Sequence, residues 1–215
     1  MSATTRYAAM SRRAAMTAAA LTAMVALAGC NSGAGATAEG DMAMGAPEGA
    51  KVTVIEYASV TCHVCAAWQE ENWEGFKTRY VDTDKVRYVF REIPTPPAEV
   101  AVAGFLIARC AGPDKYFDVV HELMASQEQM RGDPRATLFR VGNGVGLSNE
   151  RIQQCITDEA ALAAAEERAQ AARTAGVEGT PTFFVNGTKV VTLGTPSGTS
   201  LADLSKAIEA ELAKS

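Results

Sequence analysis

The sequence predicts an α/β fold in which a helical insertion divides the sheet-forming part of the chain. Within 51–95, a strand pattern, a Cys-x-x-Cys pair, a helix pattern and a second strand pattern follow one another, which is typical of a β-α-β unit. Helix patterns fill 96–175, and a strand hairpin with a closing helix follows within 176–215. We therefore expect a parallel strand pair with a right-handed crossover, completed by segments beyond the insertion.

The first expected strand covers 51–57 and contains one carboxylate, Glu56. Val52 and Val54 in this strand call for burial on at least one face. Two interpretations of Glu56 stay open at this point. It is either a strand residue that faces solvent or a buried proton acceptor near the thiols, with a pKa raised by desolvation.

The dithiol lies in Cys62-His63-Val64-Cys65, where this strand gives way to a helix pattern over 66–80. Free backbone N–H groups and the helix dipole favour a thiolate at a helix N-terminus. Cys62 is therefore the expected attacking thiol, and Cys65 can resolve a mixed disulfide formed on Cys62. The helix also carries aromatic residues that we assign to core packing, namely Trp68, Trp73, Phe76 and Tyr80.

Two other uses of Cys62 and Cys65 compete with this redox role. A zinc site usually needs a second close Cys or His pair, which Cys110, Cys155 and His121 do not form in the sequence. A purely structural disulfide across so short a loop would constrain the unfolded chain little. We therefore expect neither a metal ion nor a cofactor.

The insertion follows a proline-rich boundary and consists of consecutive helix patterns. His121 lies on the apolar side of its helix and is expected to be packed or capped. The expected helices cover 98–110, 114–130, a segment that begins at Asp133-Pro134, 149–156 with Ser148 as its N-cap, and 159–174.

Cys110 and Cys155 each end one of these helices, which makes a structural disulfide between them plausible. In the chain-entropy model, closing a loop of this length contributes about 4 kcal/mol to stability. A second redox pair is the alternative. It is less favoured because neither residue stands in a reactive turn beside another thiol.

The last part of the chain begins at a glycine-rich break before Thr180-Pro181. Strands are expected over 182–185 and 188–192, joined by the strong turn signal Asn186-Gly187. Ser200 is the expected N-cap of an amphipathic helix over 201–214.

Residues 1–29 are expected to be a secretory signal, with arginines followed by an uncharged apolar run. Leu27-Ala28-Gly29-Cys30 looks like a bacterial lipobox, which predicts cleavage before Cys30 and attachment of lipid to its sulfur. Ordinary cleavage after Ala28 is the alternative and would leave Cys30 as a free thiol. Lipidation is favoured because it leaves an even number of cysteines for an oxidising compartment.

Residues 30–50 are rich in Gly and Ala and are expected to form a lipid-anchored flexible tether with a mean reach of about 25 Å. Removal of 1–29 would take away three Arg and no acidic residue from a chain whose formal net charge is already −5. Nucleic acid is therefore not an expected partner.

Together, these motifs resemble those of the DsbA-like thiol:disulfide oxidoreductases of the thioredoxin superfamily. The resemblance covers 51–215 and depends on the Cys-x-x-Cys at a strand-to-helix turn and on the later Gly-Thr-Pro-Thr-Phe-Phe-Val-Asn-Gly. It implies a thioredoxin fold with an inserted helical domain. It also implies a cis bond between Thr180 and Pro181 beside the dithiol, where the backbone of Thr180 binds an extended substrate chain. Glu56 falls where the family carries a buried acid.

His63 marks a departure from the best-known members, which have Cys-Pro-His-Cys with the histidine before the second cysteine. It can still assist a thiolate if it is charged or donates a hydrogen bond. Reduction potentials in this superfamily run from about −270 to about −120 mV, so the two intervening residues could decide the direction of electron flow.

The predicted function is that of a lipid-anchored, periplasmic thiol:disulfide oxidoreductase, expected to be a monomer, that donates disulfides to cysteine-containing exported proteins. A membrane redox partner would re-oxidise the dithiol. A disulfide reductase or isomerase is one alternative. A non-catalytic lipoprotein that binds peptide or metal through the same groove is another.

Overall fold

The computed structural model describes residues 38–194 and 198–214. The predicted signal peptide and the predicted lipidation at Cys30 lie outside the described residues. Five strands form one mixed sheet in the order β1-β3-β2-β4-β5. The strands are β1 (Met42–Gly45), β2 (Thr53–Ala58), β3 (Arg87–Glu92), β4 (Thr182–Val185) and β5 (Thr188–Val190).

Several of the described helices begin where the sequence predicts, because a capping side chain starts them. Asp133, Ser148, Asp158 and Ser200 each accept a hydrogen bond from a backbone N–H in the first turn of the helix that follows. The helices are α1 (His63–Phe76), a π-helical turn η1 (Lys77–Val81), α2 (Ala98–Cys110), α3 (Pro113–Ala125), α4 (Gln127–Gly132), α5 (Pro134–Gly144), α6 (Asn149–Thr157), α7 (Glu159–Thr174) and α8 (Leu201–Leu212).

The predicted β-α-β unit is confirmed, since β2 and β3 pair in parallel with α1 between them. The hairpin of β4 and β5 is also confirmed, and β4 pairs antiparallel with β2. Its turn residues, Asn186 and Gly187, have φ values of 46° and 83°, a conformation that asparagine and glycine adopt most readily. Segments from both sides of the insertion therefore meet at the centre of one sheet.

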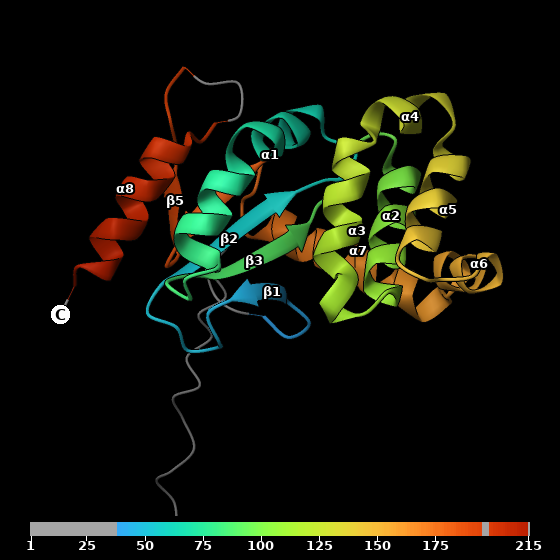
Figure 1. Ribbon diagram of the computed structural model, residues 1–215, viewed down its shortest axis with the longest axis horizontal. Coiled ribbons are helices and arrows are strands. Elements are labelled where there is room, and N and C mark those ends of the chain that lie inside the picture. The colour runs from blue at the N-terminus through green and yellow to red at the C-terminus, as the bar shows by residue number, and fades with distance from the viewer. Residues whose placement is uncertain (1–37, 195–197, 215) are drawn as a thin grey trace, which may run out of the picture. The chain divides into compact units, whose positions relative to one another are not determined.

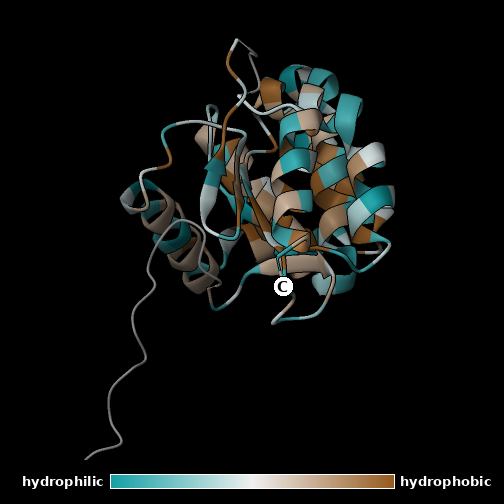
Figure 2. Ribbon diagram, turned by 90° about the vertical axis from the view of Figure 1, so that its left-hand side faces the viewer, coloured by the Kyte–Doolittle hydropathy of each residue, from teal (hydrophilic) through white to brown (hydrophobic). Residues whose placement is uncertain are grey.

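Alternation along the strands sends side chains to two apolar clusters. On one face, residues such as Val54 and Phe90 pack with α1, α3 and α8 in the larger cluster. On the other face, Ile55 and Val89 pack against Ala172 of α7. Figure 1 shows α7 running behind the sheet and the other insertion helices gathered beside it. In Figure 2, apolar positions gather where the sheet and helices meet, and hydrophilic positions lie on outer helical turns.

The expectation of a flexible tether over 30–50 is wrong for its last part, because Met42–Gly45 forms β1 and pairs antiparallel with β3. Met42 and Met44 pack against the larger core cluster. Gly45 closes the strand where a Cβ atom would lie 2.5 Å from the carbonyl oxygen of Val86. So short a strand, within a Gly- and Ala-rich segment, has too little alternation to be recognised from sequence.

The continuous helix expected over 114–130 is also wrong, because the chain turns at Ser126 between α3 and α4. Ser126 is buried, and its hydroxyl accepts a hydrogen bond from Arg140 and donates one to Glu122. Arg140 belongs to a neighbouring helix, α5, so the local helix pattern gives no sign of its contact.

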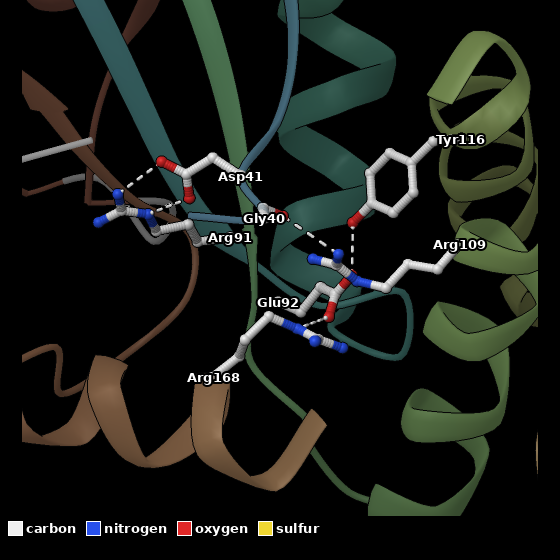
Figure 3. A network of polar contacts seen from close by, with 7 residues as sticks. All are labelled: Gly40, Asp41, Arg91, Glu92, Arg109, Tyr116 and Arg168. Atoms are coloured by element: carbon white, nitrogen blue, oxygen red, sulfur yellow. Dashed lines mark hydrogen bonds and ion pairs between the residues drawn. The ribbon is translucent and has the colours of Figure 1, made fainter. Parts of the chain in front are cut away.

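A buried carboxylate, Glu92, joins the sheet to the insertion (Figure 3). Its side chain accepts hydrogen bonds from Arg109 of α2 at 2.6 Å, Arg168 of α7 at 2.8 Å and Tyr116 of α3 at 2.9 Å. Arg109 also donates to the carbonyl oxygen of Gly40, just before β1. This network therefore fixes three helices and the start of β1 around the end of β3.

Candidate active site

The two thiols lie where the sequence predicts them, at the start of α1. Cys62 is the N-cap of this helix, with extended backbone angles, and its sulfur accepts a hydrogen bond from the backbone N–H of Cys65 at 3.2 Å. Both cysteines are free thiols in the structure. The side chain of Cys62 therefore occupies the position of a capping oxygen, where unpaired backbone N–H groups favour negative charge.

The cis-proline loop lies against the first thiol. The Thr180–Pro181 peptide bond is cis, as the family resemblance implies. The sulfur of Cys62 lies 3.5 Å from the carbonyl oxygen of Thr180, although the two residues are 118 positions apart in sequence. The pairing of β4 with β2 brings them together, because the two strands place this loop beside the β2–α1 turn.

The environment of Cys62 favours its thiolate. Hydrogen bonding from the Cys65 side chain is the main cause that lowers the pKa of Cys62 from 9.0 to about 6, and burial opposes it. Contacts with Thr180 and with the backbone N–H groups of Cys65 and Val64 lower it further. At neutral pH, Cys62 is therefore mostly ionised in the reduced protein.

Cys65 has the opposite character. Its side chain is completely buried, and desolvation raises its pKa well above the ordinary value. The hydrogen bond to Cys62 and the negative charges of Cys62 and Glu56 raise it further. The pair thus consists of an ionised outer thiol and a protonated inner thiol.

Of the two interpretations of Glu56 that the sequence leaves open, the structure supports the buried one. Only 4% of the residue is exposed, and the hydroxyl of Tyr88 donates a hydrogen bond to its carboxylate. Burial raises its pKa from 4.5 to about 7, the Tyr88 hydrogen bond lowers it, and the charge of Cys62 adds to the rise. A carboxyl group that titrates near neutrality thus lies within electrostatic reach of both thiols.

His63 is exposed on the first turn of α1. The groups that lower the pKa of Cys62 are Cys65, Thr180 and Val64. A role for His63 in stabilising the thiolate therefore stays a prediction.

Beside the cis-proline loop lies a pocket of about 330 Å³. Thr180 and Pro181 line one side of it, and Lys189 and Val191 of the hairpin segment line another. More than half of the Val191 side chain is exposed. The loop predicted to bind substrate thus borders an open, partly apolar recess.

The remaining predicted site residues lie away from the dithiol or outside the described chain. Cys110 and Cys155 are joined in a disulfide that links α2 to α6. Within 38–194 and 198–214, no group of three His, Cys, Asp or Glu side chains is arranged to hold a metal ion. Among the same residues, no helix is long and apolar enough to cross a membrane.

Sequence reasoning missed a residue of the insertion that touches the active-site turn. Gln127, at the start of α4, donates hydrogen bonds to the backbone of Val60 and Cys62. A glutamine in an unremarkable helix pattern gives no local signal of such a contact. It could be found only once the break at Ser126 was known.

Comparison with known proteins gives a consistent result. A thioredoxin family model matches residues 37–210. The chain is 31% identical over 153 residues to a "putative protein-disulfide oxidoreductase" of Rickettsia conorii, an alignment that covers 69% of this chain. It spans only 54% of that relative's length.

Solved structures agree with the fold. Alpha-DsbA1 from Wolbachia pipientis superposes with a TM-score of 0.70 at 22% identity, covering 82% of this chain and 92% of that one. A thioredoxin-like oxidoreductase from Silicibacter pomeroyi superposes with a TM-score of 0.64 at 25% identity, covering 81% and 94% of the two chains.

Proposed function

We propose that this chain, which belongs to the thioredoxin family and has a DsbA-like fold, catalyses thiol:disulfide exchange through Cys62 and Cys65 and donates disulfides to other proteins. The observation that carries this proposal is the position of the Cys62 sulfur between the N-terminus of α1 and the carbonyl group of Thr180. A sulfur held there is a good leaving group as a thiolate and can be reached next to a peptide-binding loop.

In the proposed forward reaction, a substrate thiolate attacks the Cys62 sulfur of the oxidised pair. A bond forms between the two sulfurs, the Cys62–Cys65 bond breaks, and Cys65 leaves with the electron pair and takes up a proton. A second substrate thiolate then attacks the substrate sulfur of the mixed disulfide. Cys62 leaves as a thiolate, so the substrate gains one disulfide and the enzyme pair is reduced by two electrons.

The two thiol environments favour this direction. The low pKa of Cys62, about 6, makes it a stable leaving thiolate at neutral pH. The buried Cys65 is stable only as the protonated thiol, so it needs a proton when it leaves. We assign this proton transfer to Glu56, whose pKa of about 7 lets it give or take a proton at neutral pH.

Substrate binding is assigned to the cis-proline loop and its pocket. Thr180 offers backbone groups to an extended chain, and main-chain pairing accepts many different sequences. The neighbouring pocket, lined in part by Pro181 and Val191, offers space for a substrate side chain close to the reacting sulfur.

The proposed setting is the cell envelope, with lipid on Cys30 and a periplasmic domain. The sequence of residues 1–30 supports this setting through its apolar run and lipobox. The proposed substrates are cysteine-containing exported proteins, and a membrane redox partner would restore the disulfide. Four cysteines remain after lipidation, which suits an oxidising compartment.

The test uses the full chain and two single variants. Wild-type protein, pre-oxidised, should form the disulfide of a reduced two-cysteine peptide, whereas Cys62→Ala should lose this activity. In a second experiment Cys65→Ala is mixed with the disulfide-linked dimer of a one-cysteine peptide. Cys62 attacks the peptide disulfide, one peptide leaves as a thiolate, and the mixed disulfide on Cys62 should accumulate because the resolving thiol is absent.

Two results would decide against the proposal. Full peptide oxidation by Cys62→Ala would remove Cys62 from the mechanism. A wild-type protein that reduces disulfides but does not form them would instead favour the reductase or isomerase alternative.

A further inference from the structure

The active-site turn is held from outside the thioredoxin part of the chain. The side-chain amide of Gln127, from the insertion, donates hydrogen bonds to the carbonyl oxygens of Val60 at 2.9 Å and Cys62 at 3.0 Å. Val60 is completely buried. A buried carbonyl group is costly to leave without a donor, and Gln127 supplies one to Val60. The Cys62 carbonyl also accepts from the Ala66 N–H at 3.1 Å, so Gln127 adds a second donor there.

The break between α3 and α4 brings Gln127 to this turn. The break is itself fixed, since Arg140 of α5 donates to the Ser126 hydroxyl at 2.6 Å and forms an ion pair with Glu122 of α3 at 2.9 Å. Gln127 therefore follows a turn that Arg140 stabilises, and this turn directs its amide toward the two carbonyl groups.

A second amide crosses the same boundary in the opposite direction. Gln69 of α1 donates to the backbone carbonyl oxygen of His121 on α3 at 3.1 Å. The ring of His121 packs against Trp73 of α1, with ring centroids 4.3 Å apart. The insertion thus contacts both α1, which carries the dithiol, and the turn that precedes α1.

We propose that Gln127 is a positioning residue through which the helical insertion sets the geometry of the attacking cysteine. It acts on the backbone of Cys62 and not on its sulfur. Together with the Ala66 N–H, the amide holds the Cys62 carbonyl group at the N-cap of α1, where the Cys62 sulfur meets the N–H of Cys65. Release of the turn moves the sulfur relative to that N–H group and weakens the stabilisation of the thiolate.

This inference rests on the proposed role of Cys62 as the attacking thiol. Its test compares Gln127→Met, which keeps length and removes both donors, with Gln129→Met. Gln129 lies on the same short helix with an exposed side chain, so it is a matched control. The full chain is titrated by the ultraviolet absorbance of the Cys62 thiolate and equilibrated with glutathione buffers, and its unfolding in urea is followed in parallel.

In Gln127→Met, we expect the apparent pKa of Cys62 to rise by about half a unit or more, which is about a threefold change in the ratio of thiolate to thiol. The glutathione equilibrium should shift toward the protein disulfide by about the same factor. Gln129→Met should match wild type in both measurements. A purely structural role for Gln127 would lower stability and leave the titration and the equilibrium unchanged.

A folded Gln127→Met protein with wild-type values in both measurements would overturn the proposal. If that variant does not fold, Gln127→Asn takes its place, because its amide is one methylene shorter and cannot reach both carbonyl groups. Wild-type values in a folded Gln127→Asn protein would then overturn the proposal. Absence of exchange activity in wild type would refute the proposed function. The titration and the glutathione equilibrium would still test whether Gln127 positions Cys62.

Discussion

Replacement of Glu56 by glutamine should stabilise the protein, by an amount that grows as pH rises from about 4.5 to above 7. The folded pKa of about 7 lies above the ordinary value of 4.5, so the folded state binds this proton more tightly than the unfolded state. Stability therefore falls as pH rises from below 4.5 to above 7. The difference of about 2.5 pKa units corresponds to about 3 kcal/mol. Glutamine is neutral at every pH and can still accept the hydrogen bond from Tyr88.

The assay is urea unfolding at pH 4, 6 and 8, with Cys62→Ala/Cys65→Ala as the parent so that no active-site thiol titrates. The disulfide between Cys110 and Cys155 stays intact under these conditions. The gain from Glu56→Gln should be near zero at pH 4, larger at pH 6 and largest at pH 8. About 3 kcal/mol is its upper bound, because this parent lacks the Cys62 charge that adds to the raised pKa of Glu56. A gain that does not change with pH, or a loss at pH 8, would refute the reasoning from burial.

The remaining predictions concern the thiolate, the disulfide and the buried ion pairs. Thiolate absorbance of the reduced protein should titrate with an apparent pKa of about 6 for Cys62, and a midpoint near 9 would contradict the N-cap account. Cys110→Ser/Cys155→Ser, which opens a loop with a sequence separation of 45, should lower the unfolding free energy by about 4 kcal/mol; an unchanged urea midpoint would contradict it. Glu92→Gln should cost about 3 kcal/mol because it removes the buried negative charge with which Arg109 and Arg168 form ion pairs. The exposed pair of Glu122 with Arg140 provides the control, and Glu122→Gln should cost less than about 1 kcal/mol.

The parts of the fold that could be predicted from sequence are those with a local physical signal. Cys62 and Cys65 were recognisable from their spacing at a strand-to-helix boundary, and the hairpin from Asn186-Gly187. The helix starts followed from capping residues such as Ser148. The cis bond before Pro181 came from the family resemblance and not from any local preference.

The parts that could not be predicted depend on contacts between distant segments. β1 is held by pairing with β3 and by the packing of Met42 and Met44, which a pattern of four residues does not reveal. In the sequence, Glu92 is an ordinary polar residue at the end of a strand. Its burial depends on contacts with α2, α3 and α7, which lie outside its own strand. Burial of Glu56 is decided by the helices that cover β2, so the sequence left both of its interpretations open.

The low pKa of Cys62 has a direct consequence for the redox equilibrium. At pH 7, a fall from 9.0 to about 6 stabilises the reduced form by about 1.4 kcal/mol, which makes the reduction potential about 30 mV more oxidising. Since the folded pKa is lowered, this contribution is complete above the unfolded value of 9.0 and is lost as pH falls through about 6.

The reduction potential of the Cys62–Cys65 pair is the measurement that tests the proposed direction of exchange most directly. It would be obtained by equilibration with glutathione buffers at pH 7, on a chain that begins after Cys30. The account predicts a value toward the oxidising end of the superfamily, nearer to about −120 mV than to about −270 mV. A value near −270 mV would contradict it, because such a pair would be a reductant for most exported disulfide proteins.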